Sequence, residues 1–506
     1  MNTRHPKKIG VDCETVRTSF GNFRCPVSVV GCTVGPNYKR PSVSVPAQWT
    51  VDPAHGATAL EPQTDQWWKS FNDPTLNSLI ERAVSANYDL QAATARVFEA
   101  RAVSGRVKSE YYPRIGASAS AYRERAPYYV TSGQGKLHPV ALETNVFQAG
   151  FDMAWELDIF GRIRRESQAA SRDAQASEEE RRNVLITILG DVGRYYADLR
   201  GDELRLEIAN RNVEIQSDTL HLTQERAKAG LATEFDVSRA QAQLETTKAS
   251  IPDLQTEIAA SIRRLSVLTG QEPNALAAEL TKSAALPPTP PEVAVGLPSD
   301  LLERRPDIRQ AEAQLAAGTA RIGAAKAEYF PRFSLTGTAG RQANQLHEIT
   351  LGLGNVYSIG PSVTLPIFTA GRIGSNVAEK AAITQEATAK YQTTILTSLE
   401  ETENALTNYA NEQQRRDRLQ AAVESNKLAV ELAQVQYKAG LTDFLSVLDA
   451  QRELYSTEEQ LAQSQTAIVR NLVALYKAQG GGWSISPQAG TGSKVALKAG
   501  PASNRP

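Results

Sequence analysis

The tetrapeptide Lys228-Ala229-Gly230-Leu231 recurs 210 residues later (438 − 228) as Lys438-Ala439-Gly440-Leu441. The same offset links three further pairs: Gly161-Arg162 with Gly371-Arg372, Ala240-Gln241 with Ala450-Gln451, and Gly270 with Gly480. A constant offset means that no insertion has changed the spacing. This is typical of a long helical hairpin, because an insertion would break its register. The sequence therefore predicts an internal duplication built on helical hairpins.

Two long proline-free segments, 162–229 and 372–438, carry apolar residues at helical spacing, such as Ile188, Val192 and Leu199 in the first. A helix of that length spans roughly 100 Å at about 1.5 Å per residue. Such a length favours coiled-coil packing over a compact domain.

The recurring tetrapeptides mark where these helices turn. Gly230 and Gly440 stand where a left-handed residue closes a helix. Thr233 and Asp443 follow, and both are residue types that begin a helix. We expect each long helix to end in a sharp turn and to return as a second helix. We also expect Pro252 to kink the first returning helix.

Four segments before the long helices alternate apolar and polar residues, as strands with one apolar and one polar face do: 115–122, 146–158, 332–340 and 357–365. The chain has no run of 18 apolar residues, so strands would have to carry any membrane crossing. Four strands cannot close, and open edges are not tolerated in lipid, so a membrane role requires several chains. The alternative is a soluble sheet with one wet face. The polar faces carry the candidate pore-lining residues Gln148, Asp152, Glu156, Ser358 and Thr364.

These patterns divide the chain into repeats and connections. We expect a leader at 1–31, an extended segment at 32–74, repeat 1 at 75–270, a proline-rich extended linker at 271–298, repeat 2 at 299–480, and a flexible tail at 481–506. Each repeat is expected to hold a helix, a β-hairpin and a helical hairpin. The β-hairpins are placed at 112–160 and 330–370, and the helical hairpins at 162–270 and 372–480.

Composition excludes several classes of protein. With 55 basic and 56 acidic residues the net charge is −1, so nothing points to nucleic acid. All three cysteines lie within the first 32 residues, and the five histidines are scattered, so no metal site is expected. No catalytic or phosphate-binding motif is present, and Gly133-Gln134-Gly135-Lys136 is interpreted as a turn. We therefore expect neither an enzyme nor a cofactor.

The start of the chain carries a candidate lipid site. Val29-Val30-Gly31-Cys32 resembles a lipobox, in which the cysteine is acylated. The preceding stretch is atypical of an export signal, because it is short and contains Pro26, with Asp12 and Glu14 further upstream. We expect lipid attachment at Cys32. The alternatives are a chance Gly-Cys pair and a leader that is not the natural signal.

Several longer motifs resemble one known family. They are Gly31-Cys32-Thr33-Val34-Gly35-Pro36-Asn37-Tyr38, Trp67-Trp68 with Phe71-Asn72-Asp73-Pro74, Trp155-Glu156-Leu157-Asp158 with Phe160-Gly161-Arg162, Leu301-Leu302-Glu303-Arg304-Arg305-Pro306-Asp307, and Gly480-Gly481-Gly482-Trp483. Through them the chain resembles the outer-membrane factors of tripartite efflux systems of the RND type. Within the TolC-like superfamily it is most similar to the lipoprotein branch typified by OprM and NodT.

The resemblance implies a mainly α-helical protein with a membrane portion. It implies a homotrimer whose 12-stranded β-barrel lies in the outer membrane and continues as an α-helical barrel into the periplasm. Such a protein is a passive exit channel for small molecules. The implied partners are a periplasmic adaptor (membrane fusion) protein, an inner-membrane RND-type transporter and outer-membrane lipids.

The resemblance also assigns residues to the helical tips. It implies a periplasmic gate formed by Asp236, Tyr437, Leu445, Asp449 and Arg452. The turns at Gly230, Leu231, Gly440 and Leu441 would meet the adaptor.

All of these gate residues except Tyr437 have a simpler interpretation. Asp236 lies three residues after Thr233, where a capping carboxylate belongs. Asp449 could form an i,i+3 pair with Arg452. The periodicity of its helix places Leu445 in a core.

Two other functions remain open at this point. One is an outer-membrane duct for type I protein secretion, which keeps the channel and changes the cargo. The other is a soluble coiled-coil scaffold with a small amphipathic sheet. Detergent dependence separates the scaffold from both channels, because a scaffold would be monodisperse without detergent.

Overall fold

The computed structural model describes residues 33–50, 57–58, 65–131, 133, 135, 137–290, 293–350 and 354–483. The expected leader at 1–31, Cys32 and the tail beyond Trp483 lie outside this part of the chain. Its contacts form two compact units. The first comprises the described residues up to Ser44, Asp89–Arg181 and Asp307–Thr397. The second comprises the described residues of Val45–Tyr88, of Arg182–Pro306 and from Ser398 to Trp483.

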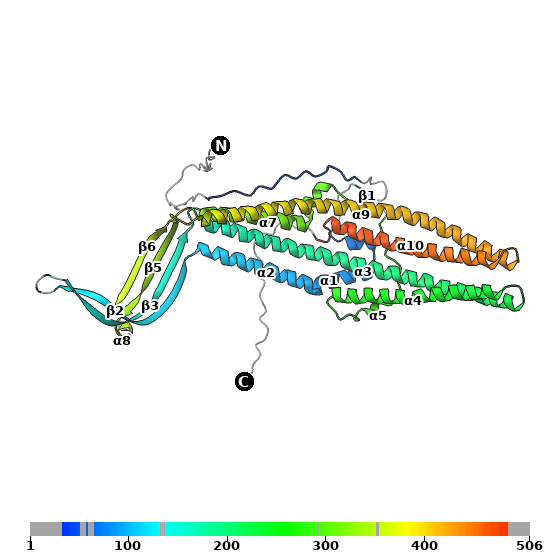
Figure 1. The fold of residues 1–506 in the computed structure, drawn as a ribbon, viewed down its shortest axis with the longest axis horizontal. Helices are drawn as coiled ribbons and strands as arrows, with labels where there is room; N and C mark the ends of the chain where they lie inside the picture. The colour runs from blue at the N-terminus through cyan, green and yellow to red at the C-terminus, as the bar shows by residue number, and fades with distance from the viewer. Residues whose placement is uncertain are drawn as a thin grey trace, which may run out of the picture. The chain divides into compact units, whose positions relative to one another are not determined.

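The first unit contains a four-stranded antiparallel sheet (Figure 1). Its strands are β2 (Arg114–Thr131), β3 (Leu137–Leu157), β5 (Arg332–Ala343) and β6 (Asn355–Thr364), in the order β2-β3-β5-β6. β3 pairs with β5, so the hairpins of the two repeats join into one sheet. The predicted fold class is confirmed in its coarse form: the chain is mainly helical and carries one amphipathic sheet.

The strands of the first hairpin are longer than their alternation predicts. The sequence indicated 115–122 and 146–158, but β2 and β3 pair from Arg114–Ala154 out to Thr131–Leu137. The extension carries charged side chains, and Arg123 bonds Glu143 across the pair at 2.8 Å. Such cross-strand charge pairs interrupt the apolar–polar alternation, so the alternation alone misses this part of the hairpin.

The long helices match their predicted bounds. α3 spans Arg162–Lys228 and returns as α4 (Glu234–Leu268), while α9 spans Arg372–Lys438 and returns as α10 (Phe444–Ala478). α4 continues through Pro252 without interruption. Figure 1 shows each returning helix beside its long helix. Among the helices described, none is long and apolar enough to cross a bilayer.

The segments around the hairpins hold more structure than the sequence indicated. Repeat 1 begins with two helices, α1 (Pro74–Ala86) and α2 (Tyr88–Lys108), and repeat 2 with α6 (Leu301–Arg304) and α7 (Pro306–Ala327). The linker at 271–298 is not wholly extended. It contains α5 (Ala277–Leu280) and β4 (Val293–Ala294), which pairs in parallel with β1 (Ala57–Thr58). A short helix, α8 (Leu346–Thr350), lies within the second β-hairpin.

The four helical turns have one construction. Gly230, Gly270, Gly440 and Gly480 all have φ between +71° and +74°. At each turn, the backbone amide of the next residue donates a hydrogen bond to the carbonyl five residues earlier. Examples are Leu231 to Arg226 at 2.8 Å and Leu441 to Gln436 at 2.9 Å. This Schellman pattern pairs carbonyls that would otherwise be left open, and it needs a left-handed residue.

Candidate functional site

The sheet has one polar face, and the cross-strand register sets it. Asp152 lies opposite Thr338, which lies opposite Ser358, so the three form one row across β3, β5 and β6. Directly opposed residues share a face, and the hydroxyls of Thr338 and Ser358 are 2.8 Å apart. Even-numbered residues of β3, β5 and β6 pair with one another, so they share this polar face. The predicted pore-lining residues that belong to it and are exposed are Gln148, Asp152, Ser358 and Thr364.

The opposite face of the sheet is apolar and exposed. Tyr357 is 84% exposed and Ile359 70% exposed, and Phe151 and Ile115 are also open. Large apolar side chains gathered on one surface mark a site that another apolar medium covers. The sheet thus has two chemically distinct exposed faces.

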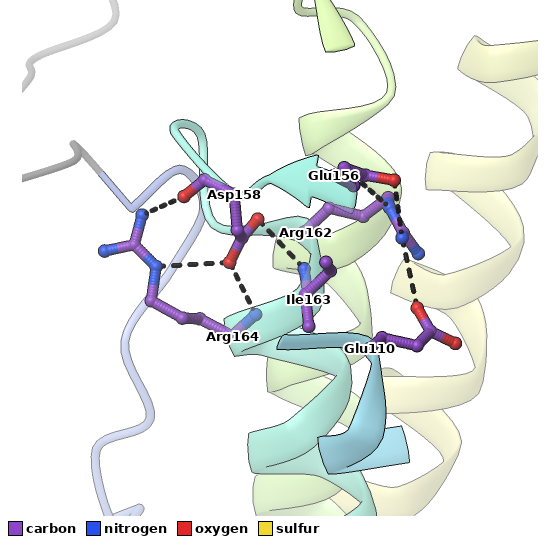
Figure 2. Close-up of polar contacts among 6 residues, drawn as sticks. All are labelled: Glu110, Glu156, Asp158, Arg162, Ile163 and Arg164. Carbon is purple, nitrogen blue, oxygen red and sulfur yellow. Dashed lines mark hydrogen bonds and ion pairs between the residues drawn. The ribbon is translucent and has the colours of Figure 1, made fainter. Parts of the chain in front are cut away.

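An ionic junction holds the end of β3 to the start of α3 (Figure 2). Arg162 donates to both carboxylate oxygens of Glu156 at 2.9 Å and to Glu110 at 3.1 Å. Burial lowers the pKa of Arg162, but the hydrogen bonds and charges of Glu156 and Glu110 outweigh it and raise the pKa above its usual value. Glu156 was predicted to line a solvated pore. It also belongs to this junction, and its part in lining a pore stays a prediction.

Asp158 caps α3 within the same junction (Figure 2). Its carboxylate accepts from the backbone amides of Ile163 at 3.0 Å and Arg164 at 2.8 Å. The Arg164 guanidinium also donates a hydrogen bond to the Asp158 carbonyl at 2.8 Å. A carboxylate at a helix N-terminus pairs open amides and interacts well with the helix dipole. The cap therefore fixes the direction in which α3 leaves β3.

Repeat 2 keeps half of this junction. Arg372 donates to Glu328 at 3.0 Å, and Asn376 donates to the other carboxylate oxygen at 3.0 Å. Arg372 and Arg162 are related by the offset of 210, and Glu328 and Glu110 by 218 (328 − 110). Both offsets can be found in the sequence. The repeat alone could therefore have indicated that Arg372 pairs with Glu328 as Arg162 pairs with Glu110.

Arg165 donates hydrogen bonds to the first described residues of the chain. The sequence did not predict this role. The Arg165 side chain is 5% exposed and donates to the carbonyls of Val34 at 3.2 Å and Gly35 at 3.3 Å, and to the Asn37 amide oxygen at 2.8 Å. The Val34 amide donates to the Phe160 carbonyl at 3.1 Å. The segment entering at Thr33 is thereby fixed against the β3–α3 junction.

The first helical tip uses its acidic residue as a cap. Asp236 accepts from the Thr233 amide at 3.0 Å and from its hydroxyl at 2.8 Å, and the Asp236 amide donates back to that hydroxyl at 3.3 Å. This is a reciprocal capping box. The capping interpretation of Asp236 is confirmed. Its proposed part in a gate stays a prediction.

At the second tip, three candidate gate residues of α10 are exposed to solvent. Asp443 caps α10, accepting from the Ser446 amide at 3.1 Å. Asp449 and Arg452 are exposed, and no ion pair joins them within the described chain. The pairing interpretation of Asp449 is therefore wrong for this structure. Leu445 is 40% exposed, so its assignment to a core is also wrong.

Tyr437 is buried, unlike the other candidate gate residues on α9 and α10. It is 6% exposed and packs in a cluster with Leu220, Ala240, Leu244, Phe444, Val447 and Leu448. Its ring lies 5.7 Å from that of Phe444, and the Arg226 guanidinium lies 4.5 Å above it. In this single chain Tyr437 joins the two helical hairpins.

The turns themselves present apolar side chains. Leu231 and Leu441 are 67% and 79% exposed. Gly230 and Gly440 are exposed, and a Cβ at either would touch no other atom. The four residues therefore form two small open surfaces, one at the end of each hairpin.

Comparison with known proteins identifies the family. The profile of the family described as "Outer membrane efflux protein" matches residues 79–271 and 297–481. The solvent efflux pump outer membrane protein SrpC of Pseudomonas putida is 34% identical over 466 residues, covering 90% of this chain and 96% of its own. Nodulation protein T of Rhizobium leguminosarum bv. trifolii is 30% identical, covering 91% of this chain and 96% of its own.

Solved structures give the same result. The outer-membrane channel OprN superposes with a TM-score of 0.83 at 36% identity, covering 89% of this chain and all of that one. The open state of the MtrE outer membrane channel of Neisseria gonorrhoeae gives 0.76 at 26% identity, with 89% and 99% covered. Two amphipathic hairpins, two long helical hairpins and a family match over both repeats agree. The chain belongs to the outer membrane efflux protein family.

Proposed function

We propose that this outer-membrane efflux protein is the passive exit duct of a tripartite pump for small toxic organic compounds. The observation that carries the proposal is the sheet with one polar and one apolar face. Lipid would cover the row of Phe151 and Tyr357, and the row of Asp152 and Ser358 would face a water-filled lumen. Similarity to solvent-pump relatives supports small compounds over a secreted protein.

We infer a homotrimer from the unpaired strand edges of a single chain. β2 and β6 are the outer strands of the described sheet, so each has a free hydrogen-bonding edge. Free edges are not stable in lipid, and three chains with four strands each would close a 12-stranded barrel. An exposed stripe on α9, made of Leu428, Leu432 and Val435, supports further packing of a helical barrel.

The proposed assembly places partners at both ends. A periplasmic adaptor would dock on the turns at Gly230-Leu231 and Gly440-Leu441, where exposed leucines offer apolar contact. An RND-type inner-membrane transporter would supply the driving force, because the duct carries no phosphate-binding motif of its own. We also propose that Cys32 is acylated. Intact-mass analysis of membrane-extracted protein tests this, and an unmodified mass that still includes residues 1–31 would contradict it.

Deletion of the protein tests its cargo. In a strain that lacks it, we expect lower tolerance of small toxic compounds such as toluene, restored by the full chain on a plasmid. The reason is that such compounds would then collect behind a closed outer membrane. Unchanged tolerance together with loss of a secreted protein would instead support type I secretion.

The tips give a second prediction. We expect Asp449→Ala, alone and more strongly with Asp236→Ala, to raise single-channel conductance in planar bilayers. In a closed trimer these side chains would fill the narrowest part of the periplasmic mouth, and alanine is smaller and uncharged. Asp218→Ala removes an exposed carboxylate farther along α3 and serves as the control. Unchanged conductance in the double variant would remove both residues from the gate.

A further inference from the structure

The apolar face of the four-stranded sheet stops at the same end on every strand. Odd-numbered residues of β2, β3, β5 and β6 pair with one another, so they share this face. Apolar side chains occupy it from the strand ends nearest α3 and α9 toward the far end of the sheet, where polar side chains replace them. The first polar residues met on the four strands are Arg123, Asn145, Arg341 and Asn355. An apolar band with a common edge is typical of a sheet that meets the surface of a bilayer.

Three arginines lie at this edge of the apolar band, and we call them the arginine rim: Arg123 and Arg125 of β2 and Arg341 of β5. The side chains of Arg123 and Arg125 are each 70% exposed, and they contact the Glu143 carboxylate at 2.8 Å and 3.6 Å. Arg341 is exposed and donates to the Ile349 carbonyl of α8 at 2.8 Å. Glu143 is the one acidic residue at the odd-numbered positions of the four described strands, so this face carries a formal charge of +2 (3 − 1).

The opposite face of the sheet does not share this charge. Glu124 lies between Arg123 and Arg125 in the sequence. Successive side chains of a strand point to opposite faces, so its carboxylate belongs to the even-numbered face, where Thr144 lies opposite it. The next residue pair on that face includes Val146, which is 4% exposed. The arginines are thus gathered on the face that continues the apolar band.

Two exposed tyrosines flank the arginine rim on the same face. Tyr357 of β6 is 84% exposed and is the last residue of the apolar band before Asn355. Tyr129 of β2 is 67% exposed and lies beyond Arg125. Tyrosine has an apolar ring and a polar hydroxyl, and such side chains form the aromatic girdles at the two surfaces of a membrane. Tyr357 therefore marks the edge of the hydrocarbon, and the Tyr129 ring is open to pack against a more polar group farther out.

Arginine at this level suits one chemistry of lipid. A guanidinium is always charged and presents a planar fork of donors that matches a phosphate group. Each basic side chain near an anionic lipid surface strengthens binding roughly fivefold. A flat aromatic ring beyond the arginines fits the face of a sugar. The order along the sheet is therefore apolar band, phosphate-matching arginines and sugar-matching ring.

We propose that the arginine rim binds the phosphate groups of a phosphorylated glycolipid in the outer leaflet of the membrane, the class to which lipopolysaccharide belongs. In such a lipid the phosphates lie where the acyl chains end and the sugars begin. Glu143 competes with these phosphates for Arg123 and Arg125. The inference rests on the proposed function, in which the apolar face of the sheet lies in lipid.

The test is a titration of the full-length protein in detergent with a lipopolysaccharide of short sugar chain, read by native mass spectrometry. We expect the triple variant Arg123→Gln, Arg125→Gln, Arg341→Gln to lower the affinity about a hundredfold, from roughly fivefold per arginine. Removal of the phosphates from the lipid should weaken its binding to the wild-type protein to the same extent. Added salt should weaken binding to the wild-type protein more than to the triple variant, because salt screens exposed charges.

The same strands supply the matched control. Arg114 of β2 and Arg332 of β5 are exposed and even-numbered, so they lie on the opposite face and at the opposite end of the sheet. The double variant Arg114→Gln, Arg332→Gln should leave the affinity unchanged. Glu143→Gln should raise it roughly fivefold, as one added net positive charge does, because the carboxylate no longer competes for two arginines.

The proposal is overturned if the triple variant binds as the wild type does, if the lipid without phosphates binds equally well, or if the control variant loses as much affinity. Phosphatidylglycerol that displaces the glycolipid at equal concentration overturns the glycolipid as the partner. The proposed duct fails separately. A protein that conducts in planar bilayers but binds no glycolipid contradicts the arginine rim alone, and a protein that forms no pores contradicts the duct.

Discussion

Gly270→Ala is expected to lower the free energy of unfolding by about 3 kcal/mol. A left-handed backbone at alanine costs about 1–2 kcal/mol, and Gly270 has φ +71°. A Cβ there would also overlap the carbonyl oxygen of Ala86, at the end of α1. Overpacking against backbone adds about 1–3 kcal/mol, because a carbonyl in a helix end cannot rotate away. Urea denaturation of the purified protein in detergent, followed by helical circular dichroism, measures the loss.

Gly440→Ala is the matched control for this change. Gly440 has φ +73° and the same Schellman bonds, but its Cβ would meet no atom within 4 Å. Gly440→Ala should therefore lower the free energy of unfolding only by the penalty for a left-handed backbone at alanine, about 1 kcal/mol. Gly480 repeats the situation of Gly270, since a Cβ there would lie 2.9 Å from the Arg304 carbonyl oxygen. Equal losses at Gly270 and Gly440 would show that the contact with Ala86 adds nothing.

Ile359→Lys is expected to destabilise the membrane-inserted protein by about 2–4 kcal/mol, the cost of a lysine on the lipid face near the bilayer midplane. Ile359 lies near the middle of β6 and is 70% exposed in the single chain. If lipid covers this face, the ammonium group must be buried in hydrocarbon. Denaturation from liposomes, or loss of a heat-resistant trimer on gels, measures the effect.

Ser358→Lys tests the opposite face of the same strand. Ser358 lies in the polar row with Thr338 and Asp152, and a lysine in a wet lumen should cost little stability. The two substitutions differ by one position, so strand propensity and depth are nearly matched. A larger loss for Ser358→Lys than for Ile359→Lys would reverse the proposed orientation of the sheet.

The local elements could be predicted from sequence because their signals are local. The bounds of α3 and α9 follow from uninterrupted helical periodicity, and their ends follow from Gly230 and Gly440, where a left-handed residue is required. The faces of β5 and β6 follow from alternation, because the side-chain period of a strand is two. Within the four-stranded sheet, the outer part of β2 and β3 was not predicted, since charge pairs such as Arg123 with Glu143 carry no apolar alternation.

The roles of single side chains could not be predicted, because they depend on partners far away in the chain. Glu156 alternates with apolar residues as a pore residue would, and only the fold shows that it also pairs with Arg162. Tyr437 resembles a tip residue, yet Leu244 and Phe444 bury it. Leu445 fits a helical core pattern, yet it is 40% exposed. In each case the deciding neighbour comes from the way elements pack, which periodicity along one helix or strand does not encode.

The sequence by itself determined the duplication, the helical hairpins with their glycine turns, and a sheet with one polar and one apolar face. These are consequences of backbone conformation and of periods of 3.6 and 2, which neighbouring residues set. The tertiary structure alone decided which residues of α3 meet α10. Arg205 and Glu459 are 254 positions apart, and only the packing of the two hairpins brings their charges into contact. The duplication predicts the hairpins, but only the tertiary structure shows which residues of one hairpin contact the other.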